Sequence, residues 1–168
     1  MIYESISQMK KILGQLDKWL DAATAHAKHK SFDPNVFLTC RLAPDQFAFV
    51  KQVQSSCDTA KFAAARLSGK EAPKHPDDEQ TIEALKARVA SVLTWLGTFS
   101  AKDFEGGETR VITTPRWEGK VMSGADFLRE HALPNFYFHT SHTFAILRHN
   151  GVDIGKRDFL GALSLHAP

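Results

Sequence analysis

Apolar residues recur at helical spacing along three long stretches of this sequence, and this periodicity is the strongest constraint on the fold. The first stretch carries its apolar residues at steps of three and four: Ile6, Met9, Leu13, Leu16 and Leu20. This spacing places the side chains on one face of an α-helix, with charged residues on the other faces. We therefore predict a long amphipathic helix that ends near Lys30, where positive charge suits a helix C-terminus.

Two further helices and a small hairpin follow the first helix. We predict a second helix from about Asp45 to Ser68, ended by Gly69. The acidic run 77–79 places negative charge at the start of a third helix, which ends near Gly97. Between residues 99 and 122 the β-branched run 111–114 and the turn signal Glu118-Gly119 predict a hairpin.

The last third of the chain predicts a short helix and then a long one. Ser123 is a suitable cap for a short helix that ends at His131, because Asp126 lies three residues later. Pro134 then opens the last long helix, which ends at Asn150-Gly151. We expect residues 152–168 to be packed irregular chain. The economical fold class is therefore all-α: one domain over residues 1–168, a four-helix bundle with a hairpin inserted before the last long helix.

Composition excludes several classes of function. Hydrophobic residues make up 43% and charged residues 24% of the 168 residues, which is typical of a soluble globular protein. The net charge is +2, and the basic residues are dispersed, so nucleic-acid and membrane partners gain no support. The two cysteines suit a reducing compartment, and the first residues lack the pattern of a signal peptide. We expect a cytoplasmic protein.

The segment 135–150 carries the residues most suggestive of chemistry. On a helix, at roughly 100° per residue, His139, His142 and His149 fall within an arc of about 80°. This segment is apolar nearly all round, so some of its histidines are expected to face the interior. His139 and His142 are neighbours on one face. They could hold zinc or nickel if Asp58, Gln54 or Cys57 on the second helix supplied a third ligand.

A structural role for each of these residues stands beside the metal hypothesis. A buried histidine is commonly packed among aromatic rings, with one nitrogen hydrogen-bonded to the protein. An ion pair between Asp58 and Lys61, one turn apart, is favoured over metal ligation, and Cys57 is favoured as a small core residue. His26 and His29 lie among lysines and are interpreted as solvated surface.

Several segments resemble an uncharacterised bacterial domain-of-unknown-function family of the DinB/YfiT-like metalloenzyme superfamily. The resemblance spans nearly the whole chain and is most specific in residues 133–139 (LPNFYFH), 145–152 (AILRHNGV) and 155–161 (GKRDFLG). Residues 41–45 (RLAPD) and 63–69 (AAARLSG) match the same family. The resemblance implies a four-helix bundle, often dimeric, with no assigned function.

The resemblance also implies a metal site that this sequence departs from. The superfamily carries one metal-binding histidine on the second helix and two on the last long helix. The last-helix positions fall on Asn135 and His139, of which only His139 keeps a ligating side chain. The second helix has no histidine, and Asp58 or Gln54 lies where one would be sought. Any bound metal would need an altered set of ligands.

We therefore expect a pocket between the second and last long helices. Its polar floor would consist of Gln54, Asp58, Asn135, His139 and His142. The leading hypothesis is a bundle that binds a small molecule or a partner and has a degenerate metal site. The alternative is a metal-dependent hydrolase or thiol transferase, with His139 and His142 as ligands and Asp58 as ligand or base. We also expect a homodimer from the resemblance.

Overall fold

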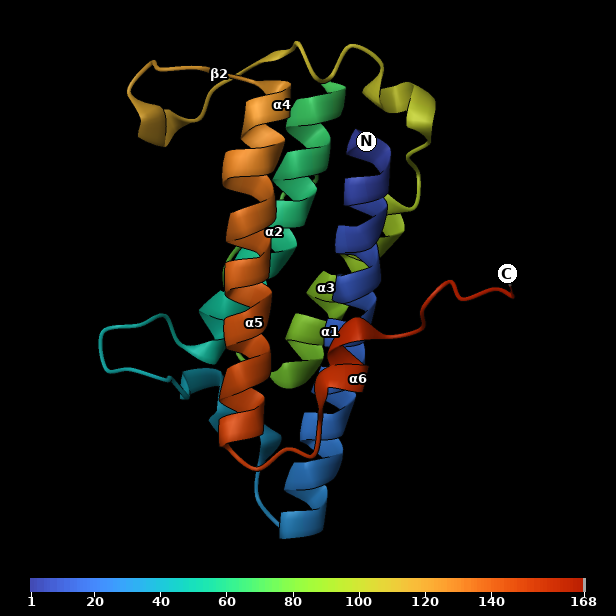
Figure 1. The fold of residues 1–168 in the computed structure, drawn as a ribbon. Helices are drawn as coiled ribbons and strands as arrows, with labels where there is room; N and C mark the ends of the chain where they lie inside the picture. The colour runs from blue at the N-terminus through green and yellow to red at the C-terminus, as the bar shows by residue number, and fades with distance from the viewer. Residues whose placement is uncertain (168) are drawn as a thin grey trace.

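The structure is a computed structural model, which describes residues 1–167. Its long helices are α1 (Ile2–Lys30), α2 (Phe49–Ser68), α3 (Ile82–Leu96) and α5 (Leu133–His149). Helix α1 packs against the other three, and α2 packs against both α3 and α5 (Figure 1). This arrangement confirms the predicted helical bundle. In the part of the chain described, no helix is long and apolar enough to cross a membrane.

The core lies between the apolar faces of these four helices. Met9, Leu13, Leu16 and Leu20 of α1 are fully buried, as the periodicity predicted. On α2 the buried residues facing the core are mostly small, and they include Cys57. Small side chains let helices approach closely, so the backbone of α2 lies near its neighbours. Cys57 is a core residue, and burial raises the pKa of its thiol to about 12.

Helix α2 begins later than the predicted Asp45. The backbone N–H of Phe49 donates to the carbonyl of Cys40 at 2.9 Å, and Arg41 donates to the carbonyl of Gln46 at 2.9 Å. These two bonds across the loop hold residues 41–48 outside the helix. A local sequence signal does not report such bonds, so the sequence placed the start of the helix too early.

Helix α3 also begins later than predicted, at Ile82 instead of the acidic run 77–79. Thr81 caps it, because its side chain accepts a hydrogen bond from the N–H of Ala84 at 3.0 Å. The acidic run is used differently. Asp77 and Glu79 form ion pairs with the buried Arg88 of α3. Their negative charge therefore stabilises a tertiary contact and not the N-terminus of the helix.

The predicted break before the last long helix is absent. Helix α4 (Gly124–Asp126), a π-helix (Phe127–Ala132) and α5 follow one another without interruption. Ser123 caps the start as predicted, accepting from the N–H of Asp126 at 3.1 Å. Pro134 lacks an N–H and would break a regular α-helix. The wider π turn, in which the N–H of Leu133 reaches the carbonyl of Leu128, accommodates it.

The predicted hairpin and tail are both present in modified form. Strands β1 (Val111–Ile112) and β2 (Met122–Ser123) pair antiparallel, with Ile112 opposite Met122, which confirms a small hairpin. The tail is not wholly irregular, because α6 (Lys156–Leu160) forms a short helix on α1. There the indole of Trp19 donates to the carbonyl of Asp158 at 3.1 Å. Pro168, the last residue of the predicted tail, lies outside the described residues.

Candidate functional site

A cleft of about 360 Å³ lies between α2 and the continuous helix formed by the π-helix and α5. The 3-10 turn η3 (Pro115–Trp117) of the hairpin borders one end, and the loop before α2 borders the other. Both segments lie on the same side of the bundle (left in Figure 1). The cleft is lined by Phe47, Lys51, Ser55, Asp58, Thr59, Phe62, Arg66, Thr114, Pro115, Arg116, Trp117, Phe127, His131, Ala132, Asn135 and His139.

Helical spacing explains why these residues share one cleft. The lining residues of α2 recur at steps of three or four, which places them on one face of the helix: Lys51, Ser55, Asp58, Thr59, Phe62 and Arg66. Across the cleft His131, Asn135 and His139 follow at steps of four. Each helix therefore turns one face to the core and another to the cleft.

His139 is held in one orientation at the loop end of the cleft. Its Nδ1 lies 2.8 Å from the side-chain oxygen of Gln52, whose own amide nitrogen donates to the carbonyl of Phe47. The Gln52 oxygen can only accept, so Nδ1 carries the proton and Nε2 offers a lone pair. Burial, followed by the charges of His142 and Lys51, lowers the pKa of His139 to about 4. The ring is therefore neutral near pH 7.

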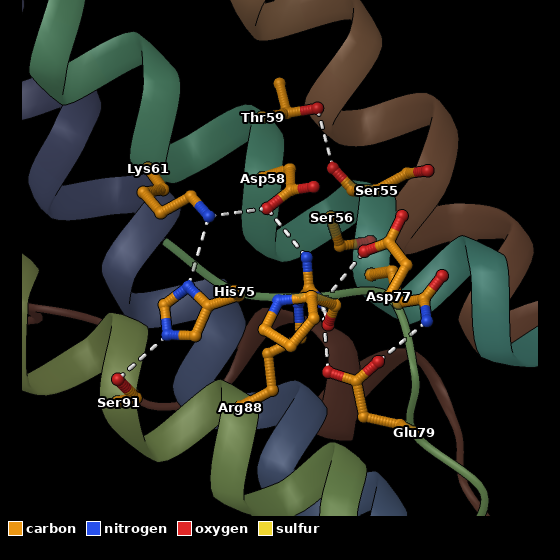
Figure 2. Close-up of polar contacts among 12 residues, drawn as sticks. Ser55, Ser56, Asp58, Thr59, Lys61, His75, Asp77, Glu79, Arg88 and Ser91 are labelled. Atoms are coloured by element: carbon orange, nitrogen blue, oxygen red, sulfur yellow. Dashed lines mark hydrogen bonds and ion pairs between the residues drawn. The ribbon is translucent and has the colours of Figure 1, made fainter. Parts of the chain in front are cut away.

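Asp58 joins the cleft to a buried network of charges (Figure 2). Its Oδ1 is 2.8 Å from the Lys61 ammonium and 2.8 Å from the Arg88 guanidinium. The predicted ion pair between Asp58 and Lys61 is thus present, and Arg88 adds a second cation from α3. The other carboxylate oxygen of Asp58 has no hydrogen-bond partner in residues 1–167 and is free for a ligand in the cleft.

The same network fastens the long connection between α2 and α3 to the bundle. Arg88 binds Glu79 at 2.9 Å and Asp77 at 3.0 Å, and Lys51 also pairs with Asp77. Burial disfavours the charged form of Arg88, but the hydrogen bond to Glu79 and the charges of Asp58 and Glu79 outweigh burial and raise its pKa. Arg88 is therefore a permanent cation with its charge balanced by three carboxylates.

Gln54 and His75 also belong to this network. The Gln54 amide donates to Glu79 at 2.7 Å. His75 lies between Lys61, 3.1 Å from its Nδ1, and Ser91, 2.9 Å from its Nε2 (Figure 2). An ammonium cannot accept a hydrogen bond, so Nδ1 accepts and Nε2 donates. Burial, then the charges of Lys61 and Arg88, lower the pKa of His75.

The hairpin end of the cleft is aromatic and basic. The ring of His131 stacks on Phe127 and meets Trp117 edge-on, each at 5.4 Å between centroids. The guanidinium of Arg66 lies 5.1 Å from the centre of the Phe62 ring and 5.8 Å from that of Phe127. Together with Arg116 it gives this end two cations.

Comparisons with known proteins identify the family. A family model described as "Domain of unknown function (DUF1993)" matches residues 1–160. The chain belongs to the DUF1993 family. Among solved structures, a DinB family member protein from Shewanella denitrificans is 48% identical and has a TM-score of 0.96, covering 100% of this chain and 96% of that chain. A search of the curated proteins finds no match. These findings confirm the expectation of an uncharacterised DinB-like family.

The five pocket residues predicted for this DUF1993 member are not all brought together. Asp58, Asn135 and His139 line the cleft. Gln54 instead turns to Glu79. His142 stacks on Phe138, with 4.1 Å between ring centroids, and its Nδ1 lies 2.6 Å from the carbonyl of the same residue.

The residues of this DUF1993 cleft do not fit a zinc or nickel ion. Within residues 1–167 no three His, Cys, Asp or Glu side chains are grouped as metal ligands require. The cleft is lined by two imidazoles, His139 at the loop end and His131 at the hairpin end, and by one carboxylate, Asp58, that is already shared by two cations. The amide nitrogen of Asn135 donates to Thr59 at 2.8 Å. Zinc sites need three or four such donors.

Sequence reasoning missed the cations that organise this site. Arg88 and Lys61 are buried, although arginine and lysine are normally exposed. A weak signal existed for Arg88, because it lies between Leu85 and Val89 on the apolar face of the third helix. No local signal indicated that Trp117 and Arg116 of the hairpin would fold over the cleft, because that depends on tertiary packing.

Proposed function

We propose that this DUF1993 chain binds a small organic molecule in the cleft between α2 and α5, and that its ancestral metal site is degenerate. The observation that carries the proposal is the cleft itself. Its volume of about 360 Å³ falls in the range of about 300–1,000 Å³ seen for small-molecule sites. Aromatic rings form its walls, and a few polar groups converge in it, which is the usual composition of such sites.

The polar groups of the cleft are arranged to accept hydrogen bonds. His139 presents Nε2, because Nδ1 is bound to Gln52. Asp58 presents one carboxylate oxygen, because the other is bound to Lys61 and Arg88. A hydroxyl or amide group of a ligand would satisfy both acceptors. Since both side chains are fixed by other residues, binding would lose little side-chain entropy.

The alternative is a metal-dependent hydrolase or thiol transferase. One observation favours it: the Nδ1 of His139 donates to a carbonyl oxygen, as metal-binding histidines commonly do. Within residues 1–167, no two further His, Cys, Asp or Glu side chains are grouped with His139 as metal ligands, which makes this alternative the weaker one. Metal content of the purified protein separates the two functions.

The proposal is tested with a neutral aromatic probe, naphthalene carboxamide. Nitrogen–proton correlation spectra are recorded during titration of the parent protein and of Ser55→Trp, which fills the cleft from α2. We expect the parent to show shifts confined to cleft residues, including the indole of Trp117, and the variant to lose them. The control is Ala87→Trp, which adds the same bulk at an exposed position of α3 outside the cleft.

Two results would overturn small-molecule binding in the cleft. One is an unperturbed parent spectrum at saturating probe. The other is a set of shifts that persists unchanged in Ser55→Trp, which would place the probe elsewhere on the surface. Thermal melts of the parent and both variants show whether each variant is folded, so that a loss of probe-induced shifts can be assigned to lost binding.

A further inference from the structure

The hairpin end of the cleft holds two guanidinium groups that have no anionic partner in residues 1–167. Neither Arg66 nor Arg116 forms an ion pair with a carboxylate there. Both line the cleft, one from α2 and one from the hairpin. Arg66 is half-buried between Phe62 and Phe127, which removes part of the water that would otherwise solvate its charge.

The other charged groups of the cleft are already balanced. Asp58 is shared by Lys61 and Arg88, and Lys51 is paired with Asp77. The uncompensated charge of the cleft is therefore positive and concentrated at the hairpin end. His131, which lies against Phe127 and Trp117, adds no counter-charge, because an imidazole is either neutral or cationic.

The ring of His131 lies within reach of both guanidinium groups. Its pKa is lowered first by burial and then by the charges of Arg66 and Arg116, so both guanidinium groups act on the same ring. Its Nδ1 is buried and has no hydrogen-bond partner among the residues that the structure describes. A buried nitrogen without a protein partner, beside two cations without a protein counter-charge, is costly, and an anionic ligand would compensate the charge.

We infer that the ligand of this cleft is an aromatic or similarly flat molecule that carries a carboxylate or phosphate group, bound at the hairpin end by Arg66 and Arg116. This inference rests on the proposed function and names the chemical class of the ligand. Guanidinium groups bind carboxylates and phosphates through paired hydrogen bonds. The flat body would lie against Trp117 and Phe62, and its polar groups would reach towards Asp58 and His139.

Three probes with the same ring system test the inference: naphthalene carboxamide, naphthalene carboxylate and naphthyl phosphate. Affinities are measured by titration calorimetry on the full chain. We expect one or both anionic probes to bind the parent about tenfold or more tightly than the amide, which corresponds to about 1.4 kcal/mol. The preference should weaken as salt is added, because it is electrostatic.

Arginine variants assign the preference to specific residues. In Arg66→Met and Arg116→Met the anionic probes should lose most of their advantage in affinity over the amide. Arg129→Met is the control, because Arg129 lies on the π-helix that borders the cleft but does not line the cleft, and it pairs with Asp126 and Glu130. If Arg66→Met does not fold, Arg116→Met and the salt dependence still decide the outcome, since Arg116 is exposed.

The inference and the proposed function can fail separately. Equal binding of the amide and both anions in the cleft would overturn the anionic ligand and leave small-molecule binding intact. An anion preference that survives both arginine substitutions would also overturn the inference. Absence of cleft binding by all three probes would overturn the proposed function itself.

Discussion

His139 makes the stability of the protein depend on pH. Its pKa in the folded chain is about 4, against an ordinary value of 6.5, so below pH 6.5 the unfolded chain binds the proton first. The free energy of unfolding should therefore fall as the pH drops from 6.5 towards 4, by at most about 3 kcal/mol from this residue. More than about one pH unit above 6.5 the ring is neutral in both states and contributes no slope.

Urea unfolding at a series of pH values checks this expectation. In His139→Gln the loss of stability between pH 6.5 and 4 should be clearly smaller than in the parent. A remaining slope is expected, because the pKa values of His75 and His131 are lowered as well. Identical pH profiles for the parent and the variant would contradict the buried, neutral state of His139.

Arg88 should be the most sensitive charged residue of the chain. Its side chain is 1% exposed and compensates Asp58, Glu79 and Asp77. Arg88→Met leaves the carboxylate of Glu79, itself 8% exposed, buried without its cation. Breaking a buried ion pair in this way costs about 3–5 kcal/mol.

The matched control lies on the same helix. Lys86 pairs with Asp21 at the surface, so Lys86→Met should lower the free energy of unfolding by less than about 1 kcal/mol. Chemical denaturation of both variants gives the comparison. A similar, small loss in each would show that the network around Arg88 is not coupled to folding.

At the scale of elements, the interiors of the helices could be predicted and several boundaries could not. The buried residues Met9, Leu13, Leu16 and Leu20 repeat with the helical period, so α1 is readable from sequence. The start of α2 is set by a hydrogen bond between Phe49 and Cys40. The acidic run 77–79 lies outside α3, because Glu79 forms an ion pair with Arg88. These contacts join distant residues, and a local pattern carries no record of them.

The same distinction applies to the candidate site. Asp58, Asn135 and His139 could be placed near one another because each lies on a predictable face of its helix. The orientation of Gln54 could not be predicted. It is set by a hydrogen bond to Glu79, and Glu79 comes near Gln54 only when the connection between α2 and α3 has folded. The π-helix could not be predicted, because a proline such as Pro134 looks the same in the sequence whether it begins a new helix or follows directly after a π-helix.

The junction between α4 and the loop before it gives a prediction about element packing. A Cβ on Gly124 would lie 1.8 Å from the carbonyl oxygen of Gly107, so the helix could start here only after a backbone shift. Gly124→Ala should destabilise the protein by about 1–3 kcal/mol. Gly14 in α1 has no atom within 4 Å of such a Cβ, and Gly14→Ala should stabilise by about 0.5–1 kcal/mol.

Thermal melts check both expectations: the melting temperature should fall in Gly124→Ala and rise in Gly14→Ala. The pair is informative because the same methyl group is added to a helix in both cases. Equal shifts in the same direction would mean that the contact between Gly124 and Gly107 does not constrain the chain.

For the whole molecule, the proposal of a degenerate metal site predicts a fold that does not depend on metal. The bundle is held by its apolar core and by the network around Arg88, and His139 is held by Gln52. None of these interactions requires a bound metal ion. Removal of divalent metal should therefore leave the melting temperature unchanged, in contrast to proteins whose structural zinc contributes directly to folding.

Elemental mass spectrometry on protein purified without a histidine tag or chelator decides this point. We expect far less than one metal ion per chain, and no change in melting temperature after dialysis against a chelator or after addition of zinc or nickel. The parent is compared with His139→Ala, because His139 is the histidine that we expect, from the family resemblance, at a metal-ligand position. Near-stoichiometric metal that is lost in this variant would instead establish a working site with an altered ligand set. Such a result would favour the hydrolase or thiol transferase over a binding protein, because a bound metal can activate a water molecule or a thiol for reaction.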